Sequence, residues 1–459
     1  MKVLLVDPPK PKWWLLADTL LPPVGLAYLA GYLRSRGVEV KILDCTAEGV
    51  GWENLRGEIE RYSPDVVGSG GPTCYVDRVV RVFRIAKEVD SSIITVAGGP
   101  HFTLTYEESL RKYPEIDYVV LGEGEVTLYE LAEALSWGLK VTSVKGLAFN
   151  REGRVVTTGV RPLIKDLDSL PLPAWDLLPM DKYRMVAWGN ATMLVSSRGC
   201  PFNCSFCSER VFWRGLWRAH SAERVVSEME LVAEKYGKRI IWFGDDTFNL
   251  NRERVERICR LLLERGLDVH WGFEGRADLL WRDRDLLPLM RRAGFFWVLI
   301  GVESCFEDEL NRYGKGITPS LVIKVFELLR DYDVVTQAMF IIGEKYDDRE
   351  RILAKAKFAV RLDLDFAIFT PLTPFPGTPL YEEAKSEGLL EVLDYAKYDL
   401  AHAVMRTKYL SASEVQALMK ECYKLFYGRM SKIVRGALSR NVFRRRVNLF
   451  FLRRFIMGF

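Results

Sequence analysis

The chain of 459 residues is too long for a single ordinary hydrophobic core, so two or three domains are expected. Hydrophobic residues make up 49% and charged residues 27%, proportions that are typical of globular proteins and exclude wholesale disorder. The opening residues 1–9 lack the features of a secretory signal, and no apolar run reaches the roughly 18 residues of a membrane-spanning helix. The sequence therefore predicts a cytoplasmic protein, in which clustered cysteines indicate metal or redox chemistry.

Residues 1–145 alternate between strand-like and helix-like segments. Helices with apolar residues at helical spacing are expected at 23–37, 76–89 and 126–135. This repetition predicts an α/β domain with a parallel, doubly wound sheet, and residues 146–159 read as a hairpin that closes it. The expected strands are 2–9, 38–44, 64–71, 92–100 and 117–125.

A proline-marked segment, 167–180, lies within a predicted connection of residues 146–190. Beyond it, strand and helix patterns alternate again over 191–385, which predicts a partial or full α/β barrel. Residues 386–459 form a predicted helical C-terminal region with a basic tail. The expected barrel strands are 192–199, 239–246, 268–276, 296–304, 334–343 and 365–372.

Three of the eight cysteines stand together in GCPFNCSFC, with the spacing C-x3-C-x2-C. A structural zinc site or a ferredoxin cluster normally takes four ligands, and no fourth cysteine is nearby. Cys200, Cys204 and Cys207 would hold three irons of a 4Fe–4S cluster and leave the fourth iron open to a ligand. The alternatives are a chance grouping, or a zinc site completed by His220.

The string RGCPFNCSFC resembles the signature of the radical S-adenosylmethionine (SAM) superfamily. The resemblance implies a partial (β/α)6 barrel in which the open iron chelates SAM. One electron then cleaves SAM to methionine and a 5′-deoxyadenosyl radical, which abstracts an unactivated hydrogen.

Further residues fit the same resemblance. Phe206 would lie by the adenine, and Glu303, in GVES, would accept from the ribose hydroxyls. Asp245 and Asp246, in FGDD, would hold the SAM amino group, or else cap the helix that follows. Arg276 would pair with the SAM carboxylate, or neutralise a nearby acid.

Small residues also follow three strands of the N-terminal region, where bare backbone lets a flat or phosphate-bearing ligand approach. Each loop could equally be an ordinary tight turn, and GxGxxG is absent after the first strand, which disfavours NAD. As a set, the strings PPVGLAYLAGYLRSRGVEVKILD, AGGPHFTLTYEE and VVLGEGEVTLYEL are similar to the B12-binding domain of cobalamin-dependent radical SAM enzymes. The expected cofactor-lining residues are Ser69, Gly70, Thr73, Gly98, Gly99, Pro100, His101, Gly122 and Glu123.

The cobalamin motif DxHxxG is missing from this domain, and His101 is its only histidine. If cobalamin binds, we therefore expect its lower face to lack a histidine ligand. The segment FTPLTPFPGTPLY resembles the end of the last barrel strand in the same subset of the superfamily. The resemblance then extends over nearly residues 1–400.

The resemblance implies three cofactors, namely a 4Fe–4S cluster, SAM and cobalamin, together with an external electron donor such as ferredoxin or flavodoxin. One SAM would supply a methyl group and a second the radical, so the expected reaction is C-methylation of a small-molecule or lipid substrate. Oxidative cyclisation or carbon–carbon coupling is the alternative, since both share the first hydrogen abstraction. No residue is singled out as catalytic.

Nine Lys and Arg, with no Asp or Glu, lie between Arg429 and the end of the chain. This basic, aromatic-rich tail predicts either peripheral contact with the inner face of the membrane or a terminal helix packed on the barrel. Nucleic acid is disfavoured, because no accessory RNA-binding module is evident.

Overall fold

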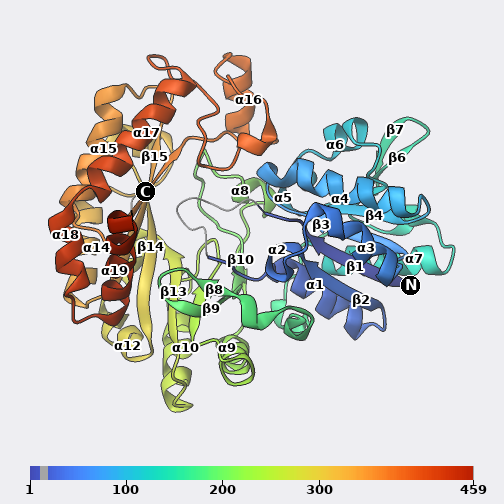
Figure 1. Cartoon of the computed structure of the whole chain (residues 1–459), viewed down its shortest axis with the longest axis horizontal. Helices are drawn as coiled ribbons and strands as arrows, with labels where there is room; N and C mark the ends of the chain where they lie inside the picture. The colour runs from blue at the N-terminus through green and yellow to red at the C-terminus, as the bar shows by residue number, and fades with distance from the viewer. Residues whose placement is uncertain (11–18, 458–459) are drawn as a thin grey trace. The chain divides into compact units, whose positions relative to one another are not determined.

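The computed structural model describes residues 1–10 and 19–457. The chain divides into two compact units, which are coloured mainly blue to cyan and green to red in Figure 1. Unit 1 contains Met1–Tyr183 with two short later segments, Val211–Arg214 and Phe375–Thr378. Unit 2 contains Arg184–Arg210, Gly215–Pro374 and Pro379–Phe459. The first unit thus extends beyond the expected 1–145 and includes most of the predicted connection.

Unit 1 is built on a seven-stranded sheet with the order β2-β1-β3-β4-β5-β6-β7. The first five strands in this order are parallel, and β6 and β7 form the predicted antiparallel hairpin at the edge. The strand order reverses between β1 and β3, so their carboxyl ends flank the crevice in which doubly wound sheets bind ligands. The strands are β1 (Lys2–Asp7), β2 (Glu39–Asp44), β3 (Val66–Gly70), β4 (Ile94–Gly98), β5 (Tyr118–Val120), β6 (Leu147–Arg151) and β7 (Arg154–Thr157).

Helices connect the parallel strands of unit 1, and the predicted doubly wound fold is confirmed. Residues of β1 and β3 are almost wholly buried because helices cover both faces of the sheet. Sequence reasoning did not identify α3, whose exposed side is strongly charged. The helices are α1 (Val24–Ser35), α2 (Cys45–Glu48), α3 (Trp52–Tyr62), α4 (Val76–Val89), α5 (Gly99–Leu104), α6 (Tyr106–Lys112) and α7 (Glu125–Ser136).

Unit 2 contains the six predicted barrel strands, paired in parallel and in sequence order, with a short antiparallel strand at one edge. The order is β16-β15-β14-β13-β12-β9-β8, so the sheet is a partial barrel. A separate two-stranded ribbon pairs β10 (Ser197–Arg198) with β11 (Arg218–Ala219). The other strands are β8 (Arg184–Met185), β9 (Gly189–Leu194), β12 (Ile240–Phe243), β13 (His270–Gly275), β14 (Phe295–Glu303), β15 (Val335–Ile342) and β16 (Phe366–Pro371).

Helices line the outside of this sheet, and stacked aromatic rings fill its core. Phe248 packs on Phe243 with ring centroids 4.6 Å apart and on Phe273 at 4.8 Å. The helices are α8 (Glu209–Phe212), α9 (Ala222–Tyr236), α10 (Arg252–Glu264), α11 (Ala277–Arg282), α12 (Leu287–Arg292), α13 (Glu307–Arg312), α14 (Pro319–Asp331), α15 (Arg349–Arg361), α16 (Pro379–Ser386), α17 (Ala412–Tyr427), α18 (Met430–Ala437) and α19 (Val442–Met457).

The last helix, α19, packs against the barrel sheet. The ring of Phe443 lies 4.1 Å from that of Phe296, and Trp188 Nε1 donates to the Phe443 carbonyl at 3.2 Å. Arg444 forms ion pairs with Asp333 and Asp365, which immediately precede β15 and β16. One side of the basic tail is therefore part of the fold. Across residues 1–10 and 19–457, none of the helices combines the length and the apolar character needed to cross a membrane.

Candidate functional site

The cysteine loop follows β10 at the carboxyl end of the barrel strands and precedes α8. Thr247 Oγ1, just after β12, donates to Cys200 Sγ at 3.1 Å. The Ser205 amide donates to the Tyr313 carbonyl at 3.0 Å, which fixes the middle of the loop to the end of α13. Gly314 has φ +64°, and a methyl group there would lie 2.9 Å from the Asn203 carbonyl oxygen. Only glycine permits this close approach.

The thiols are half-buried, and burial raises the pKa of Cys204 and raises that of Cys207 to about 12. In this setting a thiolate needs a positively charged partner, which an iron cluster supplies. Among the described residues, no three His, Cys, Asp or Glu side chains converge as ligands of one ion do. The zinc alternative with His220 therefore has no support, whereas thiolates on separate irons of a cluster need not converge on one point. The donor set fits an iron–sulfur cluster with one open iron.

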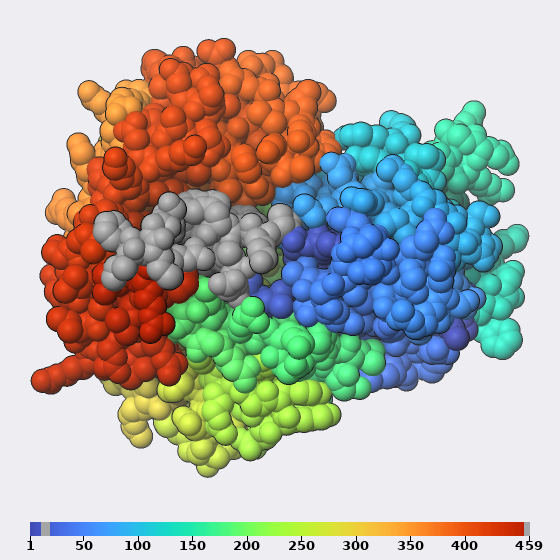
Figure 2. All heavy atoms as spheres, viewed as in Figure 1, coloured from blue at the N-terminus to red at the C-terminus, as the bar shows by residue number. Residues whose placement is uncertain are grey.

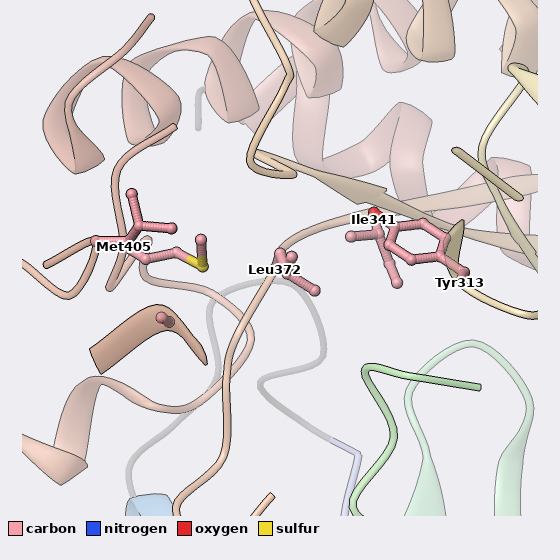
Figure 3. Packing of buried hydrophobic residues seen from close by; sticks show 6 residues of the cluster. Tyr313, Ile341, Leu372 and Met405 are labelled. Atoms are coloured by element: carbon pink, nitrogen blue, oxygen red, sulfur yellow. The ribbon is translucent and has the colours of Figure 1, made fainter. Parts of the chain in front are cut away.

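An apolar cluster lies behind the loop, and Figure 3 shows its members Tyr313 and Ile341 side by side. The predicted adenine neighbour, Phe206, packs edge-on against Tyr313 with ring centroids 5.1 Å apart. Phe206 is thus anchored to the barrel, and its contact with adenine stays a prediction. The buried members of the cluster are Tyr313, Ile341, Leu372, Ala384, Leu389 and Met405.

A buried ion network supports Tyr313. Its hydroxyl donates to Glu309 Oε1 at 2.9 Å, and Lys355 Nζ lies 2.6 Å from the same oxygen and 2.7 Å from Asp347 Oδ2. The side chains of Lys355, Glu309 and Asp347 are fully buried. Two cations thus neutralise these two carboxylates beneath the cysteine loop: the buried Lys355 at short range, and Arg351 at 3.5 Å from Glu309 and 3.7 Å from Asp347.

Replacing Lys355 by methionine is expected to lower the free energy of unfolding by about 3 kcal/mol, because two buried carboxylates lose their close cation and keep only the more distant Arg351. Urea denaturation followed by tryptophan fluorescence measures this loss, with the exposed Lys385→Met as the matched control. Equal stability of the two variants would show that the network contributes nothing to the fold.

The two aspartates after β12 have different surroundings. Asp245 is 1% exposed and accepts hydrogen bonds from the Ser196 amide and from the hydroxyls of Ser196 and Ser197, each at 2.6 Å. Asp246 accepts from the Gly199 amide at 3.0 Å, and burial together with repulsion from Glu209 raises the pKa of its carboxyl to about 8. Asp246 is therefore the better candidate to meet a cationic ligand.

The alternative that these aspartates cap a helix is wrong. The next helix, α10, begins later, at Arg252, and its N-cap is Asn251, whose side chain accepts from the Arg254 amide. The residues between β12 and α10 form turns. Asp245 and Asp246 direct their oxygens toward the segment that leads into the cysteine loop.

Glu303 ends β14 with φ +64°, a backbone conformation that is uncommon outside glycine and concentrates at functional positions. Its carboxylate is 2.6 Å from Lys315 Nζ, and both side chains are buried. Arg276 lies over the Phe202 ring at 3.6 Å, pairs with Asp278 at 3.0 Å, and donates to the Lys315 carbonyl at 2.6 Å. Arg276 thus does neutralise an acid, and its pairing with a SAM carboxylate stays a prediction.

Sequence reasoning missed Glu274, at the end of β13. Its side chain is exposed to solvent, yet desolvation by surrounding protein, with repulsion from Glu303 and Glu209, raises its pKa to about 7. A carboxyl whose pKa is perturbed by desolvation and by specific charged neighbours is a candidate functional residue. The carboxylates Glu209, Glu274 and Glu303 carry more negative charge than Lys315 neutralises. This excess of negative charge fits a ligand that carries positive charge.

In unit 1, the predicted cofactor-lining residues gather at the carboxyl ends of β3, β4 and β5. Methyl groups added at Gly70 and Gly99 would lie 2.3 Å and 2.9 Å from backbone atoms of the neighbouring loop, so glycine is required there by close packing. At Gly98 an added methyl group would meet no atom within 4 Å. This bare backbone beside open space is a surface that a flat ligand can approach.

Several of the predicted side chains are engaged within the fold. Ser69 Oγ donates to the Val6 carbonyl at 2.8 Å, and Thr73 Oγ1 lies 3.2 Å from His101 Nδ1. The carboxylate of Glu123 accepts from the Ile164 amide at 2.7 Å, and the Gly122 amide donates to Thr103 Oγ1 at 3.0 Å. Pro100 lies in the first turn of α5. Contact of these residues with a cofactor stays a prediction.

Two family models match the chain. The B12 binding domain matches residues 16–132, and the Radical SAM superfamily matches residues 194–395. An uncharacterized methyltransferase of Pyrococcus horikoshii is 37% identical, with 96% of each chain covered. The chain belongs to the radical SAM enzymes that carry a B12-binding domain. The resemblance predicted from the cysteine loop and the glycine-rich loops is thereby confirmed.

A second relative and a solved structure are similar over most of this chain. The anaerobic magnesium-protoporphyrin IX monomethyl ester cyclase of Rubrivivax gelatinosus is 32% identical, over 88% of this chain and 74% of the cyclase. The structure of the radical SAM methyltransferase TsrM of Kitasatospora setae, with cobalamin and a [4Fe–4S] cluster, has a TM-score of 0.73 at 20% identity. It covers 92% of this chain and 88% of that one, and it shows the same fold.

The cofactors of this radical SAM enzyme follow from its two domains. The radical SAM domain implies a 4Fe–4S cluster with SAM, and the B12-binding domain implies cobalamin. The three thiols of unit 2 and the glycine-rich sheet edge of unit 1 stay the predicted places of the cluster and of cobalamin.

Proposed function

We propose that this radical SAM enzyme methylates an unactivated carbon of a small-molecule or lipid substrate. The observation that carries the proposal is the group of carboxylates Asp246, Glu274 and Glu303, which follow or end barrel strands on the side of the cysteine loop, because SAM carries both an ammonium and a sulfonium charge. Similarity to a methyltransferase over 96% of both chains supports methyl transfer as the outcome. When bound, the cluster and SAM supply a hydrogen-abstracting radical, and cobalamin supplies a methyl carrier.

The residues of unit 2 would bind the cluster and SAM and orient them. Cys200, Cys204 and Cys207 hold the cluster, and Asp246 and Glu274 accept from the SAM ammonium. Their raised pKa values fall again when a cation binds beside them, so binding ionises both carboxyls. Lys315 holds Glu303 in place, and Glu303 is the candidate acceptor for the ribose hydroxyls.

In unit 1, cobalamin would lie on the bare backbone at the ends of β3, β4 and β5. His101 is 3% exposed, and burial lowers its pKa to about 4. Its ring is neutral and hydrogen-bonded to Thr73 within the fold. We therefore propose that cobalt has no histidine ligand from this domain.

His101→Ala is expected to leave the electron paramagnetic resonance spectrum of bound cob(II)alamin unchanged, because the buried ring is held by Thr73 within the fold. The same spectrum also reports any nitrogen ligand through its hyperfine splitting. A change in that splitting in the variant would establish His101 as a cobalt ligand.

A second candidate function is oxidative cyclisation, favoured by the 32% identity to the magnesium-protoporphyrin cyclase. Both functions need the same radical, and an external one-electron donor such as ferredoxin or flavodoxin. They differ in the fate of the SAM methyl group, which the cyclase reaction does not consume.

The deciding experiment uses the anaerobically reconstituted enzyme with hydroxocobalamin, a reductant and methyl-labelled SAM. Methyl transfer predicts S-adenosylhomocysteine and label in the cobalamin fraction, alongside 5′-deoxyadenosine. Formation of 5′-deoxyadenosine with no label on cobalamin would overturn methylation and favour the cyclase.

A further inference from the structure

The outer side of α19 carries a mixed stripe of cationic and apolar residues. Val442, Arg446, Leu449 and Arg453 follow one another at intervals of four, three and four positions, which places them on one face of a helix. All four side chains are exposed. The opposite side of the same helix packs on the barrel through Phe443 and the fully buried Val447.

The preceding helix has a similar outer face. Val434, Arg435 and Leu438 are exposed on α18, and Leu438, at its end, is 79% exposed. Single exposed apolar residues are ordinary on protein surfaces, but here four of them, Val434, Leu438, Val442 and Leu449, fall within sixteen positions. The segment that contains α18 and α19 is coloured red in Figure 2.

The inner and outer sides of α18 and α19 differ in how their positive charges are neutralised. Lys432 pairs with Asp363 at 2.8 Å, and Arg444 pairs with Asp333 and Asp365, so acids of the barrel neutralise the inner cations. Arg435 shares Asp363 yet stays 69% exposed. No acidic residue occurs from Arg429 to the end of the chain, so the outer stripe is purely cationic and apolar.

We propose that the outer stripes of α18 and α19, here called the basic–apolar face, bind the surface of an anionic lipid bilayer. The arginines pair with lipid phosphates, and the interleaved Val and Leu side chains enter the boundary between headgroups and acyl chains. A nucleic acid would use the arginines but would leave the apolar side chains without a role. The proposal is independent of the reaction, because it rests on surface residues of the fold.

Co-sedimentation of the full-length holoenzyme with vesicles tests the proposal. Vesicles of phosphatidylcholine alone are compared with vesicles containing about 30% phosphatidylglycerol, at low and at high salt. Two variants probe the face, Arg446→Glu combined with Arg453→Glu, and Leu438→Glu combined with Leu449→Glu. The controls are Arg151→Glu and Leu393→Glu, which change exposed residues elsewhere.

The wild type and the controls are expected to bind the anionic vesicles, and salt weakens this binding. The paired arginine variant should bind these vesicles at least about tenfold more weakly, because each basic residue near the membrane surface contributes to the attraction. The paired leucine variant should also lose affinity, which separates insertion from charge attraction alone. Unchanged thermal unfolding of each variant shows that the fold is intact.

Equal binding of variants and controls, or equal binding to neutral vesicles, would overturn the proposal. Binding of duplex RNA or DNA that depends on the same arginines but not on the leucines, with no vesicle binding, would assign the face to nucleic acid instead. Protection of residues 430–457 from hydrogen exchange on addition of anionic vesicles is the expected direct signature.

Discussion

Cys204→Ala is expected to abolish reductive cleavage of SAM to 5′-deoxyadenosine. With two thiolates left, the loop cannot hold three irons, so reconstituted protein should retain less iron and sulfide and lose the visible absorption of the cluster. Anaerobic reconstitution followed by iron analysis and quantification of 5′-deoxyadenosine measures both effects.

Cys259→Ala is the matched control, because this cysteine is a lone buried thiol in α10, away from the loop. It should reconstitute and cleave SAM as the wild type does. Cleavage of SAM at the wild-type rate by the Cys204 variant would overturn the assignment of the three cysteines.

Glu274→Gln is expected to weaken SAM binding by about ten- to a hundredfold at pH 8, the loss of one charge-assisted hydrogen bond. In the wild type, affinity should rise between pH 6 and pH 8, because Glu274 has a pKa of about 7 and binds a cation only when ionised. The variant should lack that part of the rise. Calorimetric titration of the reconstituted enzyme with SAM gives both results, and the exposed Glu307→Gln is the control.

The same substitution should stabilise the ligand-free protein. The pKa of Glu274 is higher in the folded chain than its ordinary value of 4.5, so the folded state holds the proton more tightly. Stability therefore falls as pH rises from about 4.5 to about 7, and glutamine removes this loss. A higher midpoint of thermal unfolding at pH 8, together with weaker SAM binding, would show a residue kept for function at a cost in stability. A lower midpoint would contradict this account.

Patterns in the sequence were enough to predict both sheets and the cysteine loop. Parallel strands that are buried on both faces appear as continuous apolar runs, and small residues after them mark the ligand-binding edge. The spacing of Cys200, Cys204 and Cys207 specifies chemistry directly, because it leaves a cluster with one open iron.

The sequence did not distinguish the roles of residues that are neighbours in the chain. Asp245 and Asp246 are adjacent and chemically identical, but one carboxylate is bound by serines and the other lies at the Gly199 amide. Glu274 was overlooked beside Arg276 for a related reason. Its direction is not visible in the sequence, because buried residues of β13 follow one another without the alternation that separates the two faces of a strand.

Similarly, the strained backbone of Glu303 has no sequence signature, since GVES reads as an ordinary strand end. The pairing of Glu303 with Lys315, twelve positions later, also depends on how α13 and its flanking turns lie between them, which no local pattern specifies.

The packing of Phe443 on Phe296 and Trp188 has a consequence for biosynthesis. The strands β9 to β16 pair with neighbours that are close in sequence, so the barrel sheet can grow as the chain leaves the ribosome. The partner of Trp188, however, is 255 residues away and is made only after the whole barrel sheet. The nascent barrel thus holds an uncovered aromatic surface until α19 is made, and that surface is where a chaperone would be needed.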